Sequence, residues 1–157
     1  MPLFVEKSMS EIMNGSCLCE RVCYSTAGPL RPVIASHCTQ CCKPSSHFAA
    51  ANSTARTSLT ITGEVLWYQS SLRARRGFCK NCSSQMFWDG LGNNLSIFLG
   101  CFEAPIGLTL SGHTFCAVKG DYYELADSLL QAEANNPDLT RHSIANQGSD
   151  NAFHNCH

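Results

Sequence analysis

The sequence predicts one mainly β domain, built from short antiparallel strands with a short C-terminal helix. The chain has 157 residues, 44% of them hydrophobic and 15% charged, which is enough for a single domain with a real core. Short segments rich in β-branched and aromatic residues recur between turn residues, as in antiparallel β proteins. The chain also holds 11 cysteines, an odd number that could not all pair within one chain, and metal binding is therefore the favoured explanation.

The strand signals recur along the chain in order, at 22–24, 33–35, 59–62, 65–68, 86–88, 95–99 and 115–118. Only Gly63 and Glu64 separate the third and fourth of these segments, and a glycine at the first position of a two-residue turn predicts a hairpin. From Asp121 onward, an N-cap residue, a glutamate three positions later and apolar residues at helical spacing predict a short helix.

These signals divide the chain into three parts. Residues 1–14 form an N-terminal extension, and 15–132 form the zinc-binding domain. Residues 133–157 are polar and rich in asparagine, and we expect them to form a loosely held tail.

The composition limits the classes of partner. The formal net charge of −1 gives no reason to expect nucleic acid or an anionic membrane surface. We interpret the one basic cluster, Arg73, Arg75 and Arg76, as a solvated strand face. The first 16 residues lack the unbroken apolar region of a signal peptide, and every apolar run is far shorter than the ~20 residues that span a bilayer, so we expect a cytoplasmic protein.

Two short cysteine motifs, far apart in the sequence, have the spacing of a closed zinc site. Cys17 and Cys19 form a C-x-C pair just before a predicted strand, and Cys79 and Cys82 form a C-x-x-C pair just after one. Four thiolates from two such loops can hold a tetrahedral structural zinc. A redox pair at Cys79 and Cys82 and ordinary buried thiols are the alternatives, although a redox motif normally opens a helix rather than preceding a strand.

A third motif, Ser36-His37-Cys38-Thr39-Gln40-Cys41, lies between a predicted strand and the segment 45–51. Two thiolates do not fill the coordination shell of zinc, so this site is incomplete, is completed by another residue, or is open to a ligand.

The three motifs, in this order and at this spacing, resemble the glutathione-dependent formaldehyde-activating enzyme (GFA) family, whose fold is the Mss4-like β scaffold. The resemblance runs from about Gly15 to Gln131. It implies a structural zinc on Cys17, Cys19, Cys79 and Cys82. It also implies a catalytic zinc bound by C-x-C-x-x-C, which falls here on Ser36, Cys38 and Cys41.

The sequence departs from the family pattern at the catalytic motif, where Ser36 stands in place of the first cysteine. A neutral hydroxyl is a much poorer zinc ligand than a thiolate. The candidates to replace it as a zinc ligand are Cys42, Cys101, His37 and His47. The other explanation, a small buried thiol without a ligand role, applies to Cys23, Cys42, Cys101 and Cys116. We expect Cys156 to be an exposed thiol in the tail. Ser83 and Ser46 also stand where the family carries glycine, and Cys42 where it carries arginine.

By this resemblance we expect a carbon-sulfur lyase that acts on thiol-aldehyde adducts of the glutathione type. Its metal would be zinc, and its substrate would be a small molecule. A homodimer is compatible with this function.

Two alternatives stay open. One is a repurposed lyase or isomerase without catalytic zinc, with His37 or His47 as acid or base and Cys38 or Cys41 as nucleophile. The other is a zinc-stabilised binding module. An enzyme should have a concave pocket near 36–48 lined by Trp67, Phe87 or Phe98, and a binding module an exposed apolar patch.

Overall fold

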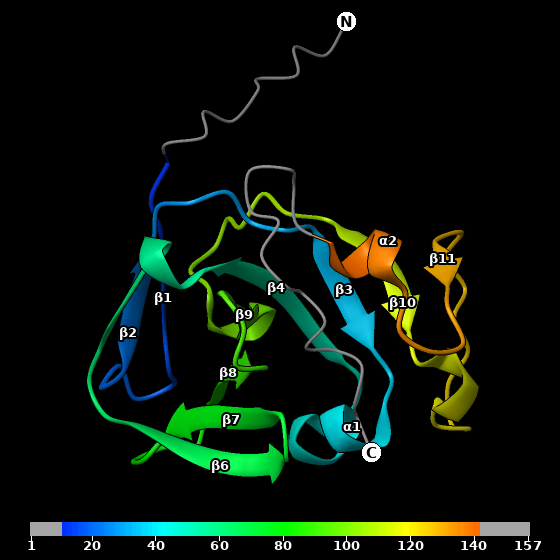
Figure 1. Ribbon diagram of the computed structural model, residues 1–157, viewed down its shortest axis with the longest axis horizontal. Helices are drawn as coiled ribbons and strands as arrows, with labels where there is room; N and C mark the ends of the chain where they lie inside the picture. Colours follow the sequence, from blue (N-terminus) through cyan, green and yellow to red (C-terminus); the bar gives the residue numbers. More distant parts are fainter. Residues whose placement is uncertain (1–10, 142–157) are drawn as a thin grey trace, which may run out of the picture.

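The computed structural model describes residues 11–141, which form two β-sheets and two short helices (Figure 1). The strands are β1 (Met13–Ser16), β2 (Cys23–Thr26), β3 (Val33–Ser36), β4 (Ala49–Ala55), β5 (Leu59–Thr62), β6 (Val65–Ser71), β7 (Ala74–Cys79), β8 (Gln85–Asp89), β9 (Asn94–Phe98), β10 (Leu110–Thr114) and β11 (Leu130–Gln131). The helices are α1 (Thr39–Ser45) and α2 (Pro137–Thr140), and single turns of 3-10 helix lie at Arg56–Ser58, Leu99–Cys101 and Cys116–Val118.

The smaller sheet has the order β1-β2-β5, and the larger sheet has the order β11-β10-β3-β4-β9-β8-β7-β6. Every pairing is antiparallel except those of β10 with β3 and with β11. The predicted mainly β fold of short, mostly antiparallel strands is therefore confirmed. None of the helices in residues 11–141 is long and apolar enough to cross a membrane.

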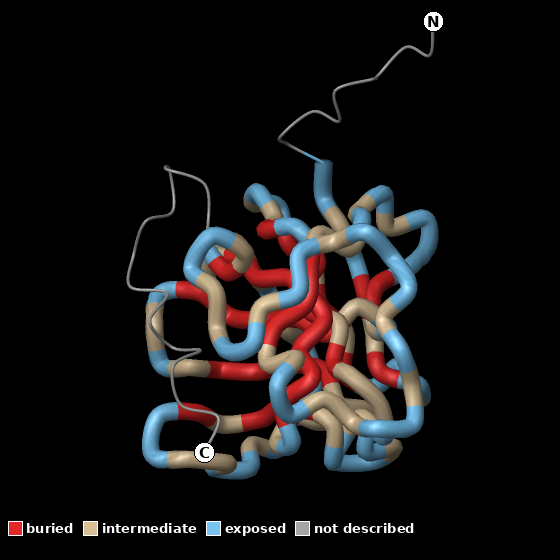
Figure 2. Tube along the Cα trace, turned by 90° about the vertical axis from the view of Figure 1, so that its right-hand side faces the viewer, coloured by how far each residue is buried: buried red, intermediate tan, exposed pale blue. Residues whose placement is uncertain are grey.

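Two apolar clusters form the core, and strand alternation separates them. Phe87 and Ile97 belong to the cluster that packs against the small sheet, where Tyr24 meets the ring of Phe87 edge to face at 5.6 Å between centroids. The next residues along the same strands, Trp88 and Phe98, belong to the second cluster, together with Cys38 and Cys41. Because successive side chains in a strand point to opposite faces, β8 and β9 contribute to both clusters. Figure 2 shows the buried segments running through the centre of the molecule.

The predicted hairpin at Gly63 is wrong. Gly63 has the positive φ that such a turn needs, 94°, but the strands before and after it pair with different partners. β5 pairs with β2 in the small sheet, and β6 pairs with β7 in the large one. The chain therefore passes from one sheet to the other at this glycine, where a Cβ would lie 2.0 Å from the carbonyl oxygen of Arg21.

The segment 115–118 is also not a strand, because Phe115 takes a left-handed conformation (φ 57°) that ends β10 and starts a 3-10 turn.

The predicted helix from Asp121 is wrong as well. Residues 121–129 contain no helix, and β11 pairs in parallel with β10 over Leu130 and Gln131. Side-chain contacts outside the segment explain the difference: Tyr123 and Asp127 hydrogen-bond to His37 and His113, and Lys119 donates to the carbonyl oxygen of Tyr123. The short C-terminal helix is instead α2, which begins at Pro137. Its N-cap is Asn136, whose side chain accepts a hydrogen bond from the amide of Asp138 at 2.9 Å.

Part of the segment that we expected to be loosely held is attached to the domain. The backbone amides of Phe115 and Ala117 donate to the carbonyl oxygens of Ala134 and Glu133, each at 3.2 Å. The remainder of that predicted tail, 142–157 with Cys156, and most of the predicted N-terminal extension, 1–10, lie outside the described residues.

Two serines take left-handed backbone conformations where the resembled family carries glycine. Ser46 has φ 61° at the C-cap of α1, and Ser83 has φ 62° in the turn between β7 and β8. A side chain at Cβ is unfavourable in this region, by about 1–2 kcal/mol.

We therefore expect Ser46→Gly and Ser83→Gly each to raise the free energy of unfolding, by about 1 kcal/mol. Urea denaturation of the zinc-loaded chain would measure the change. Ser25→Gly, inside β2, is the matched control and should lower stability, because glycine weakens a strand interior. A fall in stability for both left-handed positions would contradict the explanation.

Candidate metal centre and active-site cavity

Four cysteine sulfurs meet where the turn after β1 approaches the turn after β7. The ligand atoms of Cys17, Cys19, Cys79 and Cys82 all lie within 4.8 Å of one another, and they are the only such group of three or more metal-binding side chains in the described part of the chain. The sulfurs of Cys17 and Cys19 are 3.6 Å apart, and those of Cys19 and Cys79 are 3.7 Å apart. Zinc bonded to four thiolates at about 2.3 Å requires sulfur-sulfur distances of about 3.8 Å, so the four residues fit a zinc ion.

Hydrogen bonds lower the pKa of Cys19 and of Cys82 toward the thiolate form that binds metal. The pKa of Cys79 is instead raised to about 11, because the backbone hydrogen bonds that lower it are outweighed by burial and by the neighbouring thiols of Cys17 and Cys82. Backbone amides of Val22 and Asn81 donate to the sulfurs of Cys17 and Cys79, each at 3.3 Å. The hydroxyl and amide of Ser84 lower the pKa of Cys82 to about 5. The sequence context of a redox pair is absent here, since Cys79 ends a strand and β8 follows directly.

The structure brings Ser36, Cys38 and Cys41 together and adds an arginine. Cys38 is the N-cap of α1, and its sulfur accepts a hydrogen bond from the amide of Cys41 at 3.2 Å. The hydroxyl of Ser36 donates to the sulfur of Cys41 at 3.4 Å, and the Nη2 group of Arg76 donates to the same sulfur at 3.7 Å. Arg76 is only 5% exposed, so its interpretation as part of a solvated strand face is wrong.

Strand alternation explains why Arg76 differs from its neighbour. Arg75 lies over the ring of Trp67, 4.2 Å from its centroid, and its Nε donates to the buried carboxylate of Asp89 at 2.8 Å. Arg76 points to the other face of β7, toward α1. The basic segment Arg73-Ala74-Arg75-Arg76 does not indicate which of its arginines is buried. Only the register of β7 could have indicated which arginine points inward.

These contacts do not fit the second, catalytic zinc that the resemblance implies. Ser36 uses its hydroxyl as a donor to Cys41, and Arg76 places a positive charge beside the same sulfur, where it opposes a divalent cation. Among residues 11–141, no third His, Cys, Asp or Glu ligand joins Cys38 and Cys41 within metal-binding distance. Two thiols with this environment fall short of the three protein ligands usual in catalytic zinc sites.

We therefore expect zinc to bind with a stoichiometry of one per chain, and to stay at one in Cys38→Ser. Elemental analysis of protein purified without added metal would measure it, with the protein concentration taken from amino-acid analysis. Two zinc ions in the unmodified chain that fall to one in Cys38→Ser would show that the loop at 36–41 holds a second metal.

His37 does not face the two cysteines, because both of its ring nitrogens are engaged elsewhere. Its Nδ1 is hydrogen-bonded to the hydroxyl of Tyr123, and its Nε2 lies 3.0 Å from Nδ1 of His113. His113 in turn donates from Nε2 to Asp127 at 2.9 Å. Burial, followed by the charge of His113, lowers the pKa of His37 to about 4 and keeps it neutral at physiological pH. The four groups form one chain of hydrogen bonds, from Tyr123 through His37 and His113 to Asp127, whose carboxylate accepts at its end.

The other candidate ligands also lie away from Cys38 and Cys41, or take part in other contacts. Nδ1 of His47 is 2.6 Å from the hydroxyl of Tyr122. Cys101 packs against the first core cluster, and its sulfur donates to the carbonyl oxygen of Gln85 at 3.4 Å. Burial raises the pKa of Cys42 and of Cys101. None of the ten cysteines in residues 11–141 forms a disulfide.

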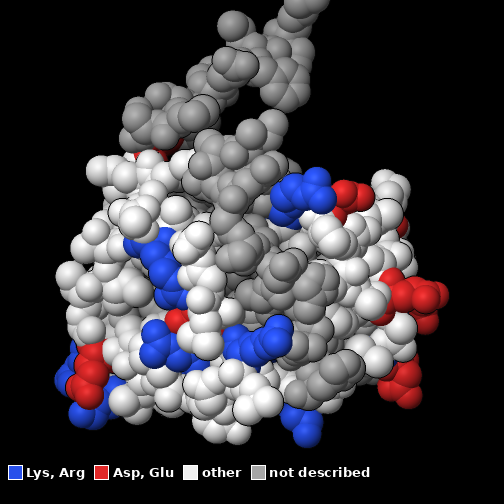
Figure 3. Space-filling view, viewed as in Figure 1, with Lys and Arg blue, Asp and Glu red and all other residues white. Residues whose placement is uncertain are grey.

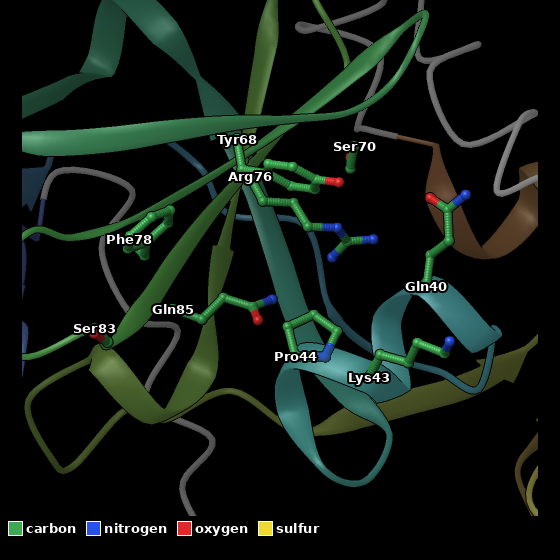
Figure 4. Close-up of a pocket in the computed structure, with 9 residues that line it drawn as sticks. All are labelled: Gln40, Lys43, Pro44, Tyr68, Ser70, Arg76, Phe78, Ser83 and Gln85. Atoms are coloured by element: carbon green, nitrogen blue, oxygen red, sulfur yellow. The ribbon is translucent and has the colours of Figure 1, made fainter.

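A cavity of about 460 Å³ opens between α1 and the strands β6, β7 and β8 (Figure 4). Its lining residues are Gln40, Lys43, Pro44, Tyr68, Ser70, Arg76, Phe78, Ser83 and Gln85. This volume lies within the usual range for small-molecule sites, about 300–1,000 Å³. Arg76 connects this cavity to Cys41, since its guanidinium touches both.

The aromatic residues that we expected to line a pocket, Trp67, Phe87 and Phe98, do not line this cavity. Trp67 and Phe87 lie in the first core cluster. Phe98, with Ser36, Cys41 and Trp88, borders only a void of about 20 Å³, about the size of one water molecule.

The fold and the cysteine cluster define a mainly β domain with a four-thiol centre that is compatible with zinc, and with a cavity of small-molecule size beside a cysteine-containing loop. A family model for the glutathione-dependent formaldehyde-activating enzymes matches residues 12–118, which is more than half of the chain. The chain belongs to this GFA family. Comparison with curated proteins gives no match.

Proposed function

We propose that the protein is a carbon-sulfur lyase of the GFA type, which forms or cleaves thiol-aldehyde adducts in the cavity between α1 and β6–β8. The observation that carries the proposal is the position of Arg76: a buried cation that lines this cavity and also touches Cys41 of the loop at 36–41. Family membership supports the reaction class, and the site residues are our assignment.

The zinc at Cys17, Cys19, Cys79 and Cys82 has a structural role in this proposal, because four thiolates leave no open position for a substrate. It clamps the turn after β1 to the turn after β7 and so fixes the strand that carries Arg76.

The proposed cleavage converts an S-hydroxymethyl thiol, or a homologous adduct, into a thiol and an aldehyde. The hydroxyl loses its proton to solvent in the cavity, the carbon-oxygen bond becomes a carbonyl and the carbon-sulfur bond breaks with its electrons on sulfur. The thiolate then takes up one proton from solvent, so the reaction releases no net proton. Formation of the adduct is the reverse.

Arg76 and Lys43 supply the electrostatics of this reaction. The guanidinium stabilises the oxygen as its negative charge develops, in the way of an oxyanion hole. The ammonium of Lys43, at the α1 side of the cavity, favours departure of the thiolate. Cys41 and Ser36 act as positioning residues: Ser36 donates to Cys41, and Cys41 accepts from Arg76.

The two alternatives from the sequence receive less support. A histidine acid or base at His37 would have to give up a hydrogen bond on one of its ring nitrogens. A binding module has no need of a cavity of this size at the loop, whereas an enzyme does.

The test is the rate of adduct breakdown, followed by trapping the released formaldehyde, with S-hydroxymethyl adducts of glutathione and of simple mercapto acids as substrates. We expect acceleration above the spontaneous rate, and a loss of about 100-fold in kcat/KM for Arg76→Gln. Lys80→Gln, which removes an exposed lysine paired with Glu64, is the matched control and should keep full activity. Full activity in Arg76→Gln, at unchanged zinc content and circular dichroism, would remove Arg76 from the mechanism.

A further inference from the structure

The cavity lining carries positive charge and no negative charge. Lys43 and Arg76 are its two cations, and none of its nine lining residues is an Asp or Glu. On the face shown in Figure 3, Lys and Arg side chains form separate groups rather than one continuous basic surface, which agrees with a site for a small anion rather than for a polyanion.

The buried polar atoms of the lining have unused hydrogen-bonding capacity. Nη1 of Arg76 and both amide atoms of Gln85 are buried and have no hydrogen-bond partner within the described residues. Figure 4 shows the Arg76 guanidinium and the Gln85 amide reaching into the space between the strands and α1. A buried donor without a partner is unfavourable, so a ligand that accepts from Arg76 and Gln85 is stabilised there.

A carboxylate is the acceptor group that fits this pair. It can accept from the planar guanidinium and from the amide, and it neutralises the buried charge of Arg76. The remaining walls, formed by Tyr68, Phe78 and Pro44, offer apolar surface for the body of the ligand.

The same lining provides no anionic partner for an ammonium group. Glutathione carries two carboxylates and one ammonium, and burying the ammonium beside Lys43 and Arg76 is unfavourable through like-charge repulsion.

We propose that the cavity selects carboxylate-bearing thiol adducts without a cationic group, that is, adducts of simple mercapto acids in preference to those of glutathione. This inference rests on the proposed function for the reaction, and on the cavity alone for the ligand class. Lys43 and Arg76 are its specificity-determining residues, and Gln85 orients the carboxylate.

The test uses three probes whose sulfur is methylated so that they do not extract zinc. They are S-methylglutathione, the analogue in which a glutaryl group replaces the γ-glutamyl residue so that only the ammonium is removed, and the dimethyl ester of that glutaryl analogue. Isothermal titration of the zinc-loaded full chain measures each Kd. We expect the ammonium-free peptide to bind at least tenfold more tightly than both S-methylglutathione and the ester. Lys43→Gln and Arg76→Gln should remove that difference, and Lys80→Gln should keep it.

Equal or tighter binding of S-methylglutathione, or of the ester, would overturn the inference. Failure of the proposed function has a different signature: the Kd preference appears and depends on Arg76, but no adduct is turned over faster than it breaks down spontaneously. Retention of the preference in Arg76→Gln and Lys43→Gln would place the ligand elsewhere and would also overturn the inference.

Discussion

Cys79→Ser is expected to lose zinc and to unfold the domain at temperatures where the unmodified chain is folded. Cys79 ends β7 and is 1% exposed, and its sulfur lies 3.7 Å from that of Cys19 on the other turn. Structural zinc contributes folding free energy directly, with apparent binding free energies of about 10 kcal/mol or more in small zinc domains. A serine hydroxyl at this position would be a neutral and much weaker ligand.

The measurement combines zinc content with the melting curve followed by circular dichroism. Cys23→Ser is the matched control: its half-buried thiol lies four positions from Cys19 but outside the four-sulfur group, so zinc and melting temperature should stay close to their original values. A Cys79→Ser protein that melts at the unmodified temperature would refute the structural assignment of this site.

Asp89→Asn is expected to lower the free energy of unfolding by about 3 kcal/mol. The carboxylate of Asp89 is 1% exposed and accepts hydrogen bonds from Arg56, from Arg75 and from the amide of Leu91. Burial acts to raise the pKa of Asp89, but the hydrogen bonds from Arg56, Leu91 and Arg75 outweigh it and hold the pKa below its usual value. The substitution would remove the negative charge that two arginines share at the end of β8.

Urea denaturation would measure this loss, and the exposed ion pair of Glu64 and Lys80 provides the comparison. Their side chains are 64% and 60% exposed, so Glu64→Gln should change stability by no more than about 0.5 kcal/mol. The Asp89 contribution should also fall as the pH drops through the lowered pKa of its carboxyl, because the native state then takes up the proton that the unfolded state already holds. Equal effects of the two substitutions would show that the pair at Asp89 is no stronger than a surface contact.

The four-cysteine cluster was predictable because its signal is local in sequence and specific in chemistry. A C-x-C and a C-x-x-C pair, each beside a strand, supply four thiolates, and few arrangements other than zinc use them together. Most of the strands around it were also predictable from short β-rich segments. The strands that were missed are β1, β4, β10 and β11. Of these, β4 is made of small residues such as Ala49 and Ala51 that pack under α1, and β11 has only two residues.

The candidate active site was less predictable, because long-range packing decides it. Nothing local distinguishes Arg76 from Arg75, yet one lines a cavity and the other pairs with Asp89. The segment after Asp121 has a sound helical pattern, but Tyr123 and Asp127 are used to hold His37 and His113, and these tertiary contacts outweigh the local preference. Such pairings depend on the placement of strands that are far apart in the sequence.

The four-cysteine cluster and the cavity share one strand. Cys79, one of the four clustered cysteines, ends β7, and Arg76 lies three residues before it on the same strand. If the cluster holds zinc and the cavity holds substrate as proposed, a cell that is short of zinc would lose the substrate site of this protein, although the metal touches no substrate. Enzyme made under zinc limitation should regain activity when the metal is restored. The supply of zinc to the cell would then determine what fraction of the protein can bind substrate.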